Sequence, residues 1–186
     1  MKTNKQIQQI VLSALGIAIV FVATILIRIP NAMQGYVNMG DGFILLFASI
    51  LNPGLSFLVG GLGSGLADVT GGYGYYFIFT LIIKGLEGFI VAYLLQKNDR
   101  PMYRILWYLI GSMIMIGGYF IADSIVNQSV WLGLASVWGN LFQAAMGFLV
   151  AIVGYPLLSK LHMVSSEKAT HKRATLFVII KKNKTI

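Results

Sequence analysis

The chain of 186 residues is 57% hydrophobic and only 11% charged, and its mean hydropathy of +0.78 is too high for an ordinary soluble domain of this size. Its net charge of +8 does not indicate a nucleic-acid surface, because 13 of the 14 lysines and arginines flank apolar segments or lie in the C-terminal tail. The lack of cysteine excludes disulfides, thiolate metal sites and cysteine nucleophiles. The composition therefore predicts an all-α integral membrane protein.

Residues 7–27 are the first predicted membrane-spanning helix, since about 20 apolar residues are needed to cross a bilayer. Within it, Ala14 and Ala18 lie one helical turn apart and form a strip of small side chains. Such strips allow close contact between helices in lipid. The strip either packs within this chain or docks onto another subunit.

A polar segment follows at residues 28–41, and a connection of this length is typical of a lid or a binding loop. At its end, Asp41 is predicted to cap the next helix by accepting hydrogen bonds from free backbone N–H groups. Asn38 is harder to explain as a capping residue and is a candidate ligand contact.

Two apolar segments, residues 43–51 and 55–69, are separated by Asn52-Pro53-Gly54, which is typical of a tight turn. They predict a helical hairpin whose first arm is short. The second arm is rich in glycine between residues 60 and 67, but the lysine and hydroxyl residue of a nucleotide-binding loop do not follow. The glycines therefore favour close helix packing.

An aromatic turn at residues 71–76 contains Tyr73 and Tyr75, which suit the membrane interface and could equally stack on a flat ligand. The fourth predicted helix ends at about residue 96 and contains Lys84 and Glu87. Charges are costly inside a bilayer, and at this spacing the two side chains share one helix face and can pair. They form either a structural ion pair or a polar wall of a ligand site.

A fifth helix is predicted at about residues 102–122 and a sixth at about residues 131–158, with a polar turn between them. The sixth carries Asn140 and Gln143 at mid-depth, where buried amides must find partners. These amides either bond to other helices or line a cavity together with Lys84 and Glu87. Such a cavity would suit a small polar ligand.

The distribution of basic residues predicts that both termini are cytoplasmic, because Arg28 alone flanks the spans on the opposite side. The predicted organisation is a membrane domain of six transmembrane helices at residues 1–161 and a basic cytoplasmic tail at residues 162–186.

With these motifs, residues 8–160 resemble the substrate-binding S components of energy-coupling factor (ECF) vitamin transporters. The resemblance rests on Ala14-x-x-x-Ala18, Asn38-Met-Gly-Asp41, Asn52-Pro-Gly54, Gly61-x-Gly-Ser-Gly-x-x-Asp68, Lys84-Gly-Leu-Glu-Gly88 and Asn140-x-x-Gln143, in this order. It implies a subunit of the bacterial plasma membrane that binds a vitamin near the outer face. It also implies docking through Ala14 and Ala18 onto a transmembrane coupling subunit attached to two cytoplasmic ATPases.

The resemblance implies that the partner subunits supply the energy, so this chain is not expected to hydrolyse ATP alone. We expect no enzymatic activity, cofactor or metal. The sequence suggests no set of convergent carboxylates, and its aromatic and amide side chains favour a small neutral ring. Hydroxymethylpyrimidine or a pyridoxine-like vitamin is expected first, and riboflavin or pantothenate next. The alternative is a small membrane enzyme that uses Lys84 and Glu87 as acid–base groups. The substrate contacts expected from the sequence are Asn38, Tyr73, Tyr75, Lys84, Glu87, Asn140 and Gln143.

Overall fold

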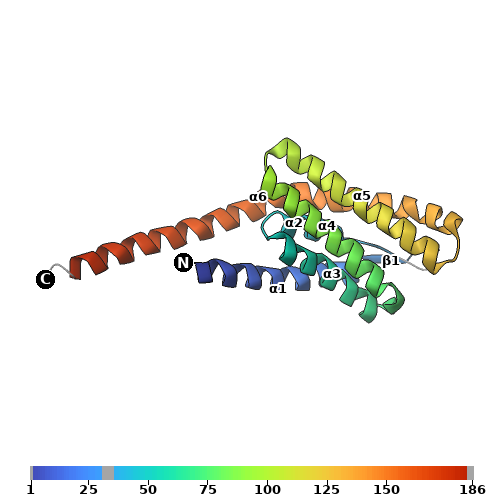
Figure 1. Ribbon diagram of the computed structural model, residues 1–186, viewed down its shortest axis with the longest axis horizontal. Coiled ribbons are helices and arrows are strands. Elements are labelled where there is room, and N and C mark those ends of the chain that lie inside the picture. The colour runs from blue at the N-terminus through green and yellow to red at the C-terminus, as the bar shows by residue number, and fades with distance from the viewer. Residues whose placement is uncertain (1, 31–35, 184–186) are drawn as a thin grey trace. The chain divides into compact units, whose positions relative to one another are not determined.

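The computed structural model describes residues 2–30 and 36–183, with side chains described for residues 5–29 and 36–160 (Figure 1). The chain divides into two units, Met1–Ile152 and Val153–Ile186. The elements are α1 (Lys2–Leu26), β1 (Arg28–Pro30), β2 (Tyr36–Asn38), α2 (Gly40–Ala48), α3 (Pro53–Thr70), the short 3-10 helix η1 (Gly74–Tyr76), α4 (Phe77–Lys97), α5 (Pro101–Val126) and α6 (Val130–Asn183).

Four of the helical segments are long and apolar enough to cross a membrane. The other two helices form the predicted hairpin. α2 has nine residues and rises about 14 Å, which is less than half of the hydrocarbon core. α3 has 18 residues and rises about 27 Å. The candidate spans are Lys5–Leu26, Gly74–Lys97, Pro101–Val126 and Val130–Lys160.

The predicted turn at Asn52-Pro53-Gly54 starts α3. Asn52 is the N-cap, and its side-chain oxygen accepts a hydrogen bond from the backbone N–H of Leu55 at 3.0 Å. Pro53 occupies the first helical position, where its missing N–H costs nothing. Pro101 begins α5 in the same way.

The glycine-rich face of α3 allows close packing against both α1 and α4, as the sequence predicts (Figure 1). A Cβ atom on Gly61 would lie 2.7 Å from the carbonyl oxygen of Leu81 in α4. A Cβ atom on Gly63 would lie 3.0 Å from the carbonyl oxygen of Ile17 in α1. Larger residues at these two positions would therefore force the helices apart.

The polar segment at residues 28–41 contains a two-stranded antiparallel ribbon that the sequence did not predict. Arg28 pairs with Asn38, Ile29 with Val37, and Pro30 with Tyr36. The centre of the segment, residues 31–35, lies outside the described residues. Strand β2 of this ribbon carries Tyr36 and Asn38.

The second unit, Val153–Ile186, begins within α6 and contains the rest of that helix, which continues to Asn183. The sequence places a domain boundary at residue 161, whereas the compact unit ends at Ile152. Whether residues 162–186 act as a cytoplasmic tail stays a prediction.

Candidate functional site

A small polar cavity lies within the first unit, where β2, α3, η1, α4, α5 and α6 meet. Its empty volume, counted together with its mouth, is about 370 Å³. Every lining side chain among the described residues carries a hydrogen-bonding group, which is unusual inside an apolar helix bundle. The lining residues are Tyr36, Asn38, Asp68, Tyr76, Thr80, Tyr119, Asp123, Asn140 and Gln143.

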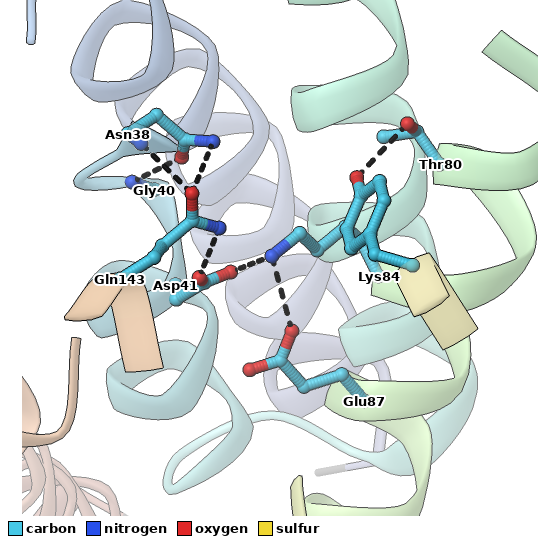
Figure 2. Close-up of polar contacts among 8 residues, drawn as sticks. Asn38, Gly40, Asp41, Thr80, Lys84, Glu87 and Gln143 are labelled. Carbon is cyan, nitrogen blue, oxygen red and sulfur yellow. Dashed lines mark hydrogen bonds and ion pairs between the residues drawn. The ribbon is translucent and has the colours of Figure 1, made fainter. Parts of the chain in front are cut away.

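Asn38 and Gln143, both predicted site residues, hydrogen bond to each other on one side of the cavity (Figure 2). The Gln143 Oε1 accepts from the Asn38 backbone N–H at 2.9 Å and from its Nδ2 at 3.3 Å. Gln143 Nε2 donates to Asp41 Oδ2 at 2.6 Å. These bonds tie β2 and α2 to α6, so both amides are largely occupied by the protein itself.

The start of α2 differs from the prediction. Met39 is the N-cap and makes no side-chain capping bond, and Asp41 lies inside the helix. Asn38 Oδ1 instead accepts a hydrogen bond from the backbone N–H of Gly40 at 2.9 Å. The predicted capping role of Asp41 is therefore wrong, because the Asp41 carboxylate turns towards Lys84 and Gln143.

Lys84 and Glu87 form the predicted pair on one face of α4, with 3.7 Å between Lys84 Nζ and Glu87 Oε2 (Figure 2). Lys84 Nζ also forms an ion pair with Asp41 Oδ1, which joins α4 to α2. Lys84 and Glu87 are completely buried, with 0% of each residue exposed. Neither residue lines the cavity. They contact the cavity wall indirectly. Lys84 pairs with Asp41, and Asp41 accepts a hydrogen bond from Gln143, which lines the cavity.

Two tyrosine–carboxylate pairs form other parts of the cavity wall. Tyr36 OH donates to Asp68 Oδ1 at 2.5 Å, and Tyr76 OH donates to Asp123 Oδ1 at 2.5 Å. Burial and the neighbouring Asp68 carboxylate raise the pKa of the Tyr36 phenol well above its usual range, so this hydroxyl stays protonated and remains a donor. Asp68 and Asp123 were not predicted as site residues.

The sequence did not indicate that two carboxylates, Asp68 and Asp123, line the cavity. Asp68 continues the face of α3 that contains Gly65 and Gly61, one and two turns earlier. Asp123 lies two turns after Ile116, a buried core residue of α5. Helical spacing to these inward-facing residues is the signal that could have identified both carboxylates.

The aromatic turn contributes Tyr76 to the cavity instead of the two predicted tyrosines. Tyr75 is exposed, and Tyr73 is half-buried with its ring 4.8 Å from the ring of Tyr36. The Arg28 guanidinium lies 5.4 Å from the centre of the Tyr36 ring and 5.5 Å from that of Tyr73. Tyr73 thus packs against the ring of Tyr36 and does not line the cavity. A ligand contact by Tyr73 or Tyr75 stays a prediction.

Asn140 is the predicted site residue best placed to contact a ligand. It lines the cavity and is half-buried, and its side chain makes no hydrogen bond with the described residues. Its amide offers both donors and an acceptor. By contrast, Thr80 Oγ1 and Tyr119 OH hydrogen bond to each other at 3.0 Å. No group of three or more His, Cys, Asp or Glu residues among the described residues could hold a metal ion.

Ala14 and Ala18 are both exposed on α1. The buried face of this helix includes Ser13, Gly16 and Val20. In this structure the small-residue strip therefore does not pack against the described part of the chain. It remains accessible to another subunit.

Comparison with known proteins identifies the family. Residues 4–163 match the family described as the S component of the ECF-type riboflavin transporter. A protein of Pyrococcus woesei, described as an uncharacterized protein in gap 3'region, is 36% identical over 132 residues, which cover 70% of this chain and 88% of that protein. The thiamine precursor transporter HmpT of Lactococcus lactis subsp. cremoris (strain MG1363) is 29% identical over 160 residues, or 84% of this chain and 91% of HmpT.

The family match covers most of the chain and includes the four candidate membrane spans and every residue that lines the cavity. It agrees with the resemblance seen in the sequence motifs. The chain is therefore a multi-pass membrane protein that belongs to the S-component family of ECF-type riboflavin transporters.

Proposed function

We propose that this chain is the substrate-specificity subunit of an ECF-type importer and captures a small water-soluble vitamin or vitamin precursor. The observation that carries the proposal is the cavity inside the apolar bundle, whose described lining side chains all carry hydrogen-bonding groups. Polar groups in such a place are energetically costly, and they usually mark a functional site. Asn140, which has no partner among the described residues, supplies a free amide for a ligand.

Hydroxymethylpyrimidine is the proposed ligand, with a pyridoxine-like vitamin as the next choice. The cavity is small, which favours one ring over the three fused rings of riboflavin. Tyrosines 36, 76 and 119 in the wall suit an aromatic ring better than the open chain of pantothenate. The name of the relative HmpT, a thiamine precursor transporter, supports the same choice.

The proposed topology has six membrane crossings with both termini and residues 162–186 on the cytoplasmic side of a bacterial plasma membrane. The four candidate spans provide four crossings, and α3 provides a fifth. The sixth combines the short helix α2 with the polar segment before it, because α2 alone is too short to cross. The excess of lysine and arginine at the termini and at residues 97–104 supports this orientation. The cavity then opens towards the outer side.

The proposed partners are a transmembrane coupling subunit and two cytoplasmic ATPases, which would supply the energy for uptake. The exposed strip of Ala14 and Ala18 is the proposed docking surface, because small residues permit close helix contact in lipid. The alternative, a membrane enzyme acting through Lys84 and Glu87, is weaker, since both side chains are buried outside the cavity lining.

Uptake of labelled hydroxymethylpyrimidine, at a concentration well below saturation, tests this function. Cells that express the chain together with the coupling subunit and the two ATPases should accumulate the compound in chemically unaltered form. Asn140→Ala should lower the uptake rate about tenfold or more. Losing one ligand hydrogen bond and leaving its partner unpaired costs roughly 1–3 kcal/mol. The amounts of the wild-type chain and of Asn140→Ala in the membrane should be equal.

Asn98→Ala is the matched control, because Asn98 lies between α4 and α5 and does not line the cavity. We expect wild-type uptake for this variant. Recovery of a chemically altered compound would favour the enzyme. Uptake that is unchanged in Asn140→Ala would contradict the assignment of the cavity as the ligand site.

A further inference from the structure

We propose that Asp68 accepts a hydrogen bond from an amino group of the ligand, so that the cavity selects amino-substituted rings over their carbonyl counterparts. This inference rests on the proposed function and adds to it the chemical basis of selectivity. Asp68 lines the cavity near the end of α3 and is only 3% exposed. Its Oδ1 accepts from Tyr36, but its buried Oδ2 has no hydrogen-bond partner among the described residues.

The hydroxyl groups of the wall do not satisfy this oxygen. Two of them donate to carboxylates, Tyr36 to Asp68 Oδ1 and Tyr76 to Asp123 Oδ1. The other two bond to each other, and the Thr80 hydroxyl also lies near the Asp68 carboxyl without a hydrogen bond to Oδ2. The four hydroxyls belong to Tyr36, Tyr76, Thr80 and Tyr119.

The nearby cations are also occupied. Lys84 Nζ pairs with Asp41 and lies near Glu87. Arg28 Nη1 donates to the carbonyl oxygen of Gly71 at 3.3 Å. Neither forms an ion pair with Asp68, so a buried carboxylate oxygen is left to be satisfied by a group that enters the cavity.

The chemistry of that group follows from the acceptor. An amino group donates to a carboxylate oxygen, whereas a ring carbonyl would place one acceptor against another. Asn140 can accept or donate elsewhere on the ring. Asp68 therefore both attracts an amine and disfavours a carbonyl at the same position, and this double effect is a common basis of specificity.

Asp68→Asn tests the proposal with little change in shape. Asparagine keeps an oxygen for Tyr36 and replaces the unpaired oxygen with an NH2 donor. The probes are hydroxymethylpyrimidine, which carries a ring amino group, and its deaminated analogue, which carries a carbonyl there. We expect the purified wild-type chain to prefer the amino compound, and Asp68→Asn to lower the ratio of the two affinities by about tenfold or more, since hydrogen bonds to charged groups are the stronger ones.

Asp99→Asn is the control, because it makes the same substitution at an exposed carboxylate that pairs with Arg104. It should leave the affinity ratio unchanged. Equal affinity of the wild-type chain for both probes would overturn the inference even if Asp68→Asn failed to fold. An unchanged ratio in folded Asp68→Asn would do the same. Binding of neither probe to the wild-type chain would instead overturn hydroxymethylpyrimidine as the proposed ligand, on which the inference rests.

Discussion

Lys84→Met is expected to destabilise the chain by about 3–5 kcal/mol, the usual cost of removing one partner from a buried ion pair. Lys84 is the positive charge between two buried carboxylates, Asp41 in α2 and Glu87 in α4. Without it both carboxylates would stay buried without a counter-charge. Thermal unfolding of the detergent-purified variant should therefore begin well below the wild-type temperature, or the variant should aggregate during extraction.

Lys97→Met is the matched control, because it removes an exposed lysine at the end of the same helix. It should unfold close to the wild-type temperature. Combining Lys84→Met with Asp41→Asn and Glu87→Gln should restore much of the lost stability, since no uncompensated charge remains. Wild-type stability of Lys84→Met alone would show that the network does not hold α2 against α4.

Ala14→Trp or Ala18→Trp is expected to abolish co-purification with the coupling subunits and ATP-driven uptake, while vitamin affinity of the isolated chain stays nearly intact. Both alanines are exposed on α1, and neither lines the cavity. A bulky side chain on the strip would prevent the close helix approach on which association in lipid depends. A single substitution should thus abolish transport while it leaves vitamin binding intact.

Met113→Trp is the control for this experiment, since Met113 is exposed on α5, away from the strip. We expect it to retain both assembly and uptake. Loss of vitamin binding in Ala14→Trp or Ala18→Trp would show that the strip packs within the subunit. Normal assembly of these variants would place the docking surface elsewhere.

Local sequence signals were sufficient for most of the helical framework. Hydropathy located the four candidate spans, and the Asn52-Pro53-Gly54 signature located the start of α3. The pairing of Lys84 with Glu87 could be predicted because helix geometry alone brings them together. The β1–β2 ribbon was missed, because strands of three residues carry too little pattern to be recognised.

The site was harder to predict because its contacts join distant parts of the chain. Gln143 bonds to Asp41 across 102 positions, and no single-sequence pattern indicates such a partner. The capping preference of aspartate gave a local explanation for Asp41, but its ion pair with Lys84 prevailed. In the aromatic turn, the sequence could not indicate which tyrosine faces inward, and the one-turn helix η1 turns Tyr76 towards the cavity.

Equilibrium binding of radiolabelled hydroxymethylpyrimidine to the purified wild-type chain, in detergent and without ATP, tests most directly whether the cavity is a vitamin site. We expect saturable binding of one molecule per chain, with no effect of added ATP and with weaker competition by riboflavin and pantothenate than by unlabelled hydroxymethylpyrimidine. Failure of the folded chain to bind hydroxymethylpyrimidine, pyridoxine, riboflavin or pantothenate saturably would contradict its role as a vitamin-binding subunit.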